Sequence, residues 1–166
     1  STDADFAALY PPGFFAHRKA FSRQGKYGSW LLAQNVVLVI NDTAFAHGGF
    51  PPWLADHTLG DINQRFQSEL RELLELGERL VGDHRYPRWT DLLDPSSLPQ
   101  PDERRGSSFP WARFADLQNS PLFGVEGPAW YRGTAQCHPL IERSRLLRVL
   151  AKLQLERVVL GHTPTA

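Results

Sequence analysis

This sequence is short of sulfur and has no excess of charge. Its 166 residues contain no methionine and a single cysteine, Cys137, which excludes a disulfide within the chain. Eighteen Lys and Arg residues balance eighteen Asp and Glu residues, so no broad positive field draws the chain to nucleic acid or to an anionic membrane. The longest apolar runs, such as residues 36–40, are too short to cross a bilayer. We expect no nucleic-acid partner and no membrane span. The compartment stays open, because Ser1 is not a natural start of translation.

Two stretches have the periodicity of amphipathic helices. The hydrophobic content, 42%, is enough for one ordinary core, which predicts a single domain over residues 1–166. Apolar residues recur at helical spacing over residues 59–81 and again over residues 141–153. Between these helices, residues 83–110 are rich in proline and charge, which is typical of an irregular excursion.

The first part of the chain is rich in aromatic residues. Residues 17–23 and 27–33 each predict a short helix, with Gly25 between them. The aromatic side chains of this part are predicted to form core rather than a ligand platform: Phe14, Phe15, Phe21, Tyr27 and Trp30.

Three short apolar runs predict strands. Residues 36–40 and 43–47 flank Asn41 and Asp42, a pair that tolerates positive φ and suits a two-residue hairpin turn. Residues 157–160 directly follow the second predicted helix. Helix, short strand and then a functional residue is the order of an α/β unit, so the predicted fold class is α/β.

A histidine follows two of these strands. His47 stands before Gly48 and Gly49, and His162 follows Gly161. A strand leaves its last residue at the edge of the sheet, and a neighbouring glycine lets the backbone turn so that the imidazole faces an open crevice. We interpret His47 and His162 as metal ligands.

Three segments, in this order, resemble the later motifs of calcineurin-like metallophosphoesterases: residues 41–49 (NDTAFAHGG), 127–133 (GPAWYRG) and 158–165 (VVLGHTPT). They are most similar to the bacterial Shewanella-like branch of the phosphoprotein phosphatases. The resemblance implies a four-layer sandwich, in which two mixed sheets lie between helices. It also implies two divalent ions (Mn, Fe or Zn) about 3.5–4 Å apart, one of them bound by both histidines. A hydroxide on the metal would attack the phosphorus of a phosphate monoester.

Arg132, within the second of these segments, is the candidate substrate-binding residue. A planar guanidinium can hold two phosphoryl oxygens, and the alternative is an ordinary surface salt bridge. Trp130 and Tyr131 either line a pocket or simply pack. The remaining histidines have no matching partners and are predicted to be solvated or to cap helices: His17, His57, His84 and His138.

The earlier motifs of that family, Asp-x-His, Gly-Asp-x-x-Asp-Arg and Gly-Asn-His-Glu, do not occur before His47. We therefore expect the later part of a phosphoesterase domain, without its first metal-binding half, and an isolated chain that turns over nothing. The expected substrate is a phosphoprotein or a small phosphate ester. Three different functions also fit the sequence: a non-catalytic phosphate-binding module, a natural half that assembles with a second chain, and an enzyme that acts on dinucleoside polyphosphates.

Overall fold

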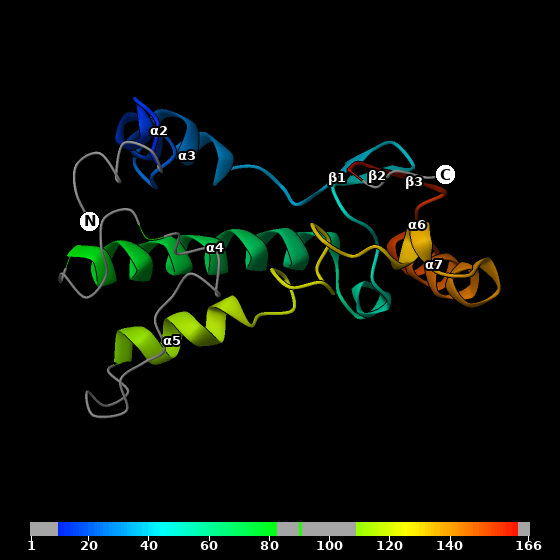
Figure 1. The fold of residues 1–166 in the computed structure, drawn as a ribbon. Helices are drawn as coiled ribbons and strands as arrows, with labels where there is room; N and C mark the ends of the chain where they lie inside the picture. Colours follow the sequence, from blue (N-terminus) through cyan, green and yellow to red (C-terminus); the bar gives the residue numbers. More distant parts are fainter. Residues whose placement is uncertain (1–9, 83–89, 91–108, 163–166) are drawn as a thin grey trace. The chain divides into compact units, whose positions relative to one another are not determined.

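The structure is a computed structural model that describes residues 10–82, 90 and 109–162 (Figure 1). The excursion predicted over residues 83–110 lies outside the described residues, apart from residue 90 and its last two positions. By its internal packing the chain divides into two units, Ser1–Gln34 and Asn35–Ala166, and each is described by itself. The single domain stays a prediction.

The first unit contains two short helices in its described part. Helix α2 (Phe14–Ala20) begins after Gly13, whose φ is 89°, and helix α3 (Lys26–Leu31) follows a short turn. A Cβ on Gly28 would lie 2.0 Å from the carbonyl oxygen of Ser22. Glycine therefore lets α3 fold back onto the end of the preceding turn. Both helices begin earlier than the sequence predicts.

The prediction of an aromatic core in this unit is wrong for most of the residues concerned. The rings of Phe21 and Tyr27 contact each other in a tilted arrangement with their centroids 5.2 Å apart, yet the residues are 43% and 47% exposed. Phe15 and Trp30 are exposed as well. In the described part of this unit the rings contact one another in pairs, as Phe14 does with Phe15 and His17 with Phe21, instead of converging on one buried centre.

The second unit contains a three-stranded mixed sheet. Strand β1 (Val37–Ile40) pairs antiparallel with β2 (Thr43–Ala46), and β2 pairs parallel with β3 (Arg157–Leu160). The strand order is β1-β2-β3, so β2 is central. At the hairpin turn Asn41 has a φ of 57°, a left-handed conformation that asparagine adopts more easily than most residues. With its helices, this sheet confirms the predicted α/β class.

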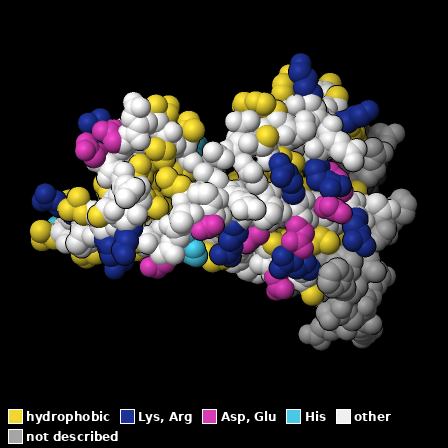
Figure 2. All heavy atoms as spheres, turned by 180° about the vertical axis from the view of Figure 1, so that it is seen from behind, with side chains coloured by type: hydrophobic (Ala, Val, Ile, Leu, Met, Phe, Trp, Pro, Cys, Tyr) yellow, Lys and Arg dark blue, Asp and Glu magenta, His cyan; other side chains and the backbone are white. Residues whose placement is uncertain are grey.

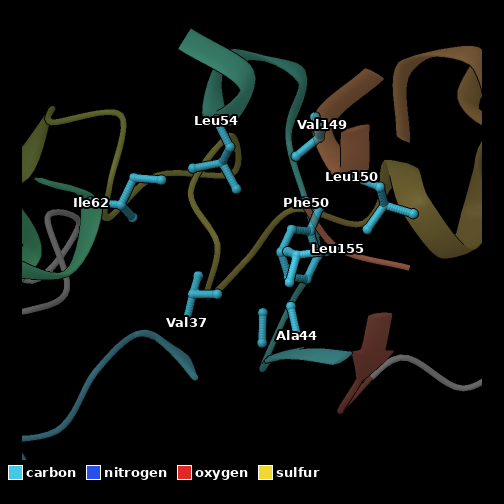
Figure 3. Close-up of a cluster of buried hydrophobic side chains, with 9 residues drawn as sticks. Val37, Ala44, Phe50, Leu54, Ile62, Val149, Leu150 and Leu155 are labelled. Atoms are coloured by element: carbon cyan, nitrogen blue, oxygen red, sulfur yellow. The ribbon is translucent and has the colours of Figure 1, made fainter. Parts of the chain in front are cut away.

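One core cluster packs against a single face of the sheet (Figure 3). The 3-10 helix η1 (Pro52–Asp56) and helix α7 (Pro139–Leu153) contribute side chains that pack against the strand residues of this cluster. Phe50 is fully buried and lies among Leu150, Leu155 and Val149 in the close-up. The buried members are Val37, Ala44, Ala46, Phe50, Leu54, Ile62, Val149, Leu150 and Leu155.

A second core cluster joins helix α4 (Leu59–Gly82) to helix α5 (Phe109–Gln118), which lies beside it (Figure 1). The Thr58 hydroxyl caps α4 by accepting from the Asp61 amide at 3.1 Å, a reason for the helix to begin there. The predicted long helix is thus confirmed. The buried members of this second cluster are Leu73, Leu76, Leu80, Phe114 and Leu117.

Helix α7 is capped at both ends. His138 precedes it, and its Nδ1 accepts from the Leu140 amide at 3.2 Å, so the capping role predicted for this histidine is confirmed. Pro139 occupies the first turn, where its missing N–H costs nothing. Gln154 ends the helix in the left-handed conformation, with a φ of 57°. The chain then enters β3 almost immediately.

Basic and acidic side chains are interspersed on the face shown in Figure 2, in keeping with the balanced composition. Among the helices that the structure describes, none combines the length and the apolar character needed to cross a bilayer.

Candidate functional site

The two strands that precede His47 and His162 end side by side. Ala46 at the end of β2 is opposite Leu160 at the end of β3, and the strands run in the same direction. The Gly161 amide donates to the carbonyl oxygen of Ala46 at 3.2 Å, which extends the pairing by one residue. Parallel strands bring their carboxyl ends to one edge of the sheet, so both histidines emerge there.

The imidazoles of His47 and His162 meet at this edge. Nε2 of His47 lies 2.9 Å from Nδ1 of His162, although the residues are 115 positions apart in the chain. Their ring centroids are 4.8 Å apart and the planes are nearly perpendicular, at 81°. His162 has a φ of 54°, so its backbone turns out of the strand into the left-handed region. One nitrogen donates and the other accepts, which means that the two rings face each other through their polar edges.

This spacing is compatible with two adjacent ligands of one metal ion. With metal–nitrogen distances of about 2.1 Å, ligand nitrogens stand about 3.0 Å apart at a right angle and about 3.4 Å apart at a tetrahedral angle. The observed 2.9 Å is close to the first value. Within the described ranges, no group of three or more His, Cys, Asp or Glu residues is placed to hold a metal. The pair therefore fits part of a coordination sphere.

Residues 127–133 pack against the turn that follows His47. The amides of Gly48 and Gly49 both donate to the carbonyl oxygen of Pro128, at 2.8 and 3.1 Å. A Cβ on Gly48 would lie 2.6 Å from the carbonyl carbon of Ala129, so this close approach of two backbones requires glycine. The described parts of the three sequence segments thus come together: two through the sheet and the third through these hydrogen bonds.

Arg132 stands at the end of that packed segment, half-buried, and helix α6 (Gly133–Gln136) begins after it. Its guanidinium carbon lies 5.9 Å from the centroid of the Trp130 ring. Its Nη1 is buried and has no hydrogen-bond partner, an uncommon state that costs free energy unless an acceptor binds there. In the part of the chain that the structure describes, one other buried side-chain atom shares this state, Oε2 of Glu142.

Tyr131 packs instead of lining an open pocket. It is 7% exposed, and its hydroxyl donates to Oε1 of Glu142 at 2.8 Å. Desolvation, together with this hydrogen bond, raises the pKa of Tyr131 to about 12, so the phenol stays neutral and keeps its proton to donate. Trp130, in contrast, is 53% exposed.

Sequence reasoning missed Glu142. It is buried, at 3% exposed, in the first turn of α7, and Arg145 lies 3.7 Å from its second oxygen. A glutamate in the first turn of a helix is ordinary by sequence, since carboxylates are favoured near a positive helix end. The chain therefore offers no local signal that this one is buried.

Asp42 belongs to the opposite end of the hairpin and not to the site. The Thr43 hydroxyl donates to its carboxylate at 2.9 Å, and Arg157 lies 3.4 Å away, which together hold the pKa of Asp42 below its usual value. His57 contacts the Trp53 ring edge to face, with centroids 5.6 Å apart. His84 lies outside the described residues.

The chain matches no family model, and neither the curated proteins nor the solved structures contain a significant match to it. Any inference about function therefore depends on the geometry of the site.

Proposed function

We propose that this chain is part of a two-metal phosphoesterase, similar to phosphoprotein phosphatases, that hydrolyses phosphate monoesters. The α/β unit described above would then form part of a four-layer sandwich. His47 and His162 are two ligands of one divalent ion, and Arg132 contacts the phosphoryl group. The observation that carries the proposal is the 2.9 Å separation of the two imidazole nitrogens at the edge of a parallel strand pair.

The chain's own residues bring these groups together, and an ion that took both ring nitrogens would replace the hydrogen bond between them. The register of β2 and β3 sets the separation of the histidines, and neutral imidazoles offer lone pairs that suit Mn, Fe or Zn. The bound ions, when present, supply Lewis acidity and a hydroxide for attack on phosphorus. Arg132 has a buried nitrogen that lacks an acceptor, and a phosphoryl oxygen would satisfy it.

Metal binding tests the ligand pair directly. Zn²⁺ and Mn²⁺ are titrated calorimetrically into the chain and into His47→Ala and His162→Ala. We expect each substitution to weaken binding at least tenfold, and the double variant to be no worse than either single one, because one ligand cannot hold the ion alone. His57→Ala removes an exposed imidazole from the same unit and serves as the matched control. Binding that is indifferent to both substitutions contradicts the proposal.

A second candidate, a non-catalytic phosphate-binding module, is favoured by Nη1 of Arg132, a buried donor without a partner that an anion would satisfy whether or not a metal is present. Inorganic phosphate binding that is lost in Arg132→Ala but unaffected by His47→Ala would select this function. Sedimentation would reveal assembly with a second chain. A comparison of anhydride with monoester substrates would reveal action on dinucleoside polyphosphates.

A further inference from the structure

We propose that the hydrogen bond from Tyr131 to Glu142 is a positioning device: it holds residues 127–133, with Arg132 near their end, against the turn that follows His47. The phosphate role of Arg132 in this inference rests on the proposed function. The packing of residues 127–133 against the turn after His47 does not depend on the proposed function, because it follows from contacts within the second unit.

Tyr131 lies so close to Gly49 and Gly133 that neither position has room for a Cβ. A Cβ on Gly49 would lie 2.6 Å from the Tyr131 carbonyl oxygen and 3.0 Å from its Cδ1. A Cβ on Gly133 would lie 2.2 Å from the phenolic oxygen itself. The ring therefore fills a space between the turn after His47 and the first residue of α6. Both the backbone and the ring of Tyr131 lie close to Gly49, so the position of the ring is coupled to that of the segment that leads to Arg132.

The third side of this space is the buried carboxylate of Glu142. Its Oε1 accepts from Tyr131, while Oε2 has no hydrogen bond and Arg145 stands 3.7 Å away. Burying a carboxylate with so few partners costs free energy that an apolar side chain would not. Unlike an apolar side chain, Glu142 accepts a directional hydrogen bond from the Tyr131 hydroxyl. The bond therefore selects the position of the Tyr131 ring and does more than add stability.

Hydrogen exchange tests the docking without reference to activity. The amides of Gly48 and Gly49 both bond to Pro128, so their exchange reports whether residues 127–133 are in place. We expect Tyr131→Phe to speed exchange at both amides about five- to tenfold, the effect of losing one hydrogen bond. Amides of β1 serve as the internal reference and should be unchanged. Unchanged exchange at Gly48 and Gly49 in Tyr131→Phe overturns the inference.

Two substitutions at Glu142 separate positioning from charge. Glu142→Gln keeps a side-chain oxygen that accepts from Tyr131, so its exchange at Gly48 and Gly49 should resemble wild type. Glu142→Leu keeps a similar volume without an acceptor and should resemble Tyr131→Phe. If Glu142→Gln instead behaves like Glu142→Leu, the charge matters and not the hydrogen bond, which also overturns the inference. If Glu142→Leu does not fold, the comparison of Tyr131→Phe with Glu142→Gln still distinguishes the effect of the hydrogen bond from that of the charge.

Measurements of phosphate and Zn²⁺ binding test whether the hydrogen bond from Tyr131 to Glu142 affects the candidate site. Tyr131→Phe should weaken binding of inorganic phosphate, followed by ³¹P NMR, by about as much as it speeds exchange. It should leave Zn²⁺ binding unchanged, because the histidines are held by β2 and β3. Equal loss of both ligands would mean general damage to the site and would contradict a positioning role. If the wild-type chain binds neither ligand, the proposed function fails while the exchange result still stands.

Discussion

The Gly48 amide donates to the carbonyl oxygen of Pro128 at 2.8 Å, which joins the turn after β2 to a segment some 80 positions further along the chain. Neither residue has functional side-chain chemistry. Their contact nevertheless fixes where residues 127–133, which include Arg132, lie relative to the turn that follows His47.

Replacing Gly48 by alanine should damage the fold and the site together. The new Cβ would lie 2.6 Å from backbone atoms of Ala129 and Trp130, which cannot move aside as a flexible side chain would. We expect a loss of about 1–3 kcal/mol in the free energy of unfolding, measured by urea titration. Gly60→Ala is the matched control, because its nearest neighbour is a Thr58 oxygen at 3.7 Å and alanine favours the helix. Equal stability of the two variants would contradict the close approach.

Alkaline pH should destabilise the chain through Tyr131. Its pKa is raised to about 12 in the folded chain from a usual value of 10, so the unfolded chain loses the phenolic proton first. The stabilisation is complete below pH 10 and is lost as the pH rises through about 12. Urea unfolding at pH 9 and pH 11 should show the decline in wild type. In Tyr131→Phe the free energy of unfolding should fall less between these two pH values. Tyr27→Phe, at an exposed residue, should show the same fall as wild type.

Truncation of Phe50 should be the most costly of the core substitutions. The side chain is fully buried between the sheet and α7 (Figure 3), so Phe50→Ala leaves a cavity that the sheet cannot close. We expect a loss of about 3–5 kcal/mol in the free energy of unfolding. Val159→Ala, at a strand position that is 47% exposed, should cost much less. A similar cost for both would argue against the assignment of this core face.

The chain alone should not hydrolyse p-nitrophenyl phosphate above the rate that the added Mn²⁺ or Zn²⁺ supports. The two proposed ligands among the described residues would fill only part of a coordination sphere, which binds an ion weakly. The release of nitrophenol is the measurement. Turnover that is abolished in His47→Ala would contradict this prediction and show that the chain provides a complete site.

Much of the local structure could be predicted because its cause is local. The tolerance of Asn41 for positive φ produces the hairpin, and the apolar period over residues 59–81 produces α4. For His138 the sequence predicted either a solvated or a capping side chain, and the structure shows the cap. The aromatic residues of the first unit show the limit of this reasoning, because whether Trp30 is buried depends on what lies opposite it and not on its neighbours in sequence.

By itself, the sequence determined that His47 and His162 each follow a short strand and that glycines adjoin both. Only the tertiary structure decided that these strands are parallel neighbours in register, which brings the two imidazole nitrogens to 2.9 Å. It also decided that Glu142 is buried under Tyr131 and that Arg132 keeps a nitrogen without an acceptor. The physical reason is the same in each case: strand pairing and burial are contacts between distant segments, and local propensity does not encode which distant residue will be the partner.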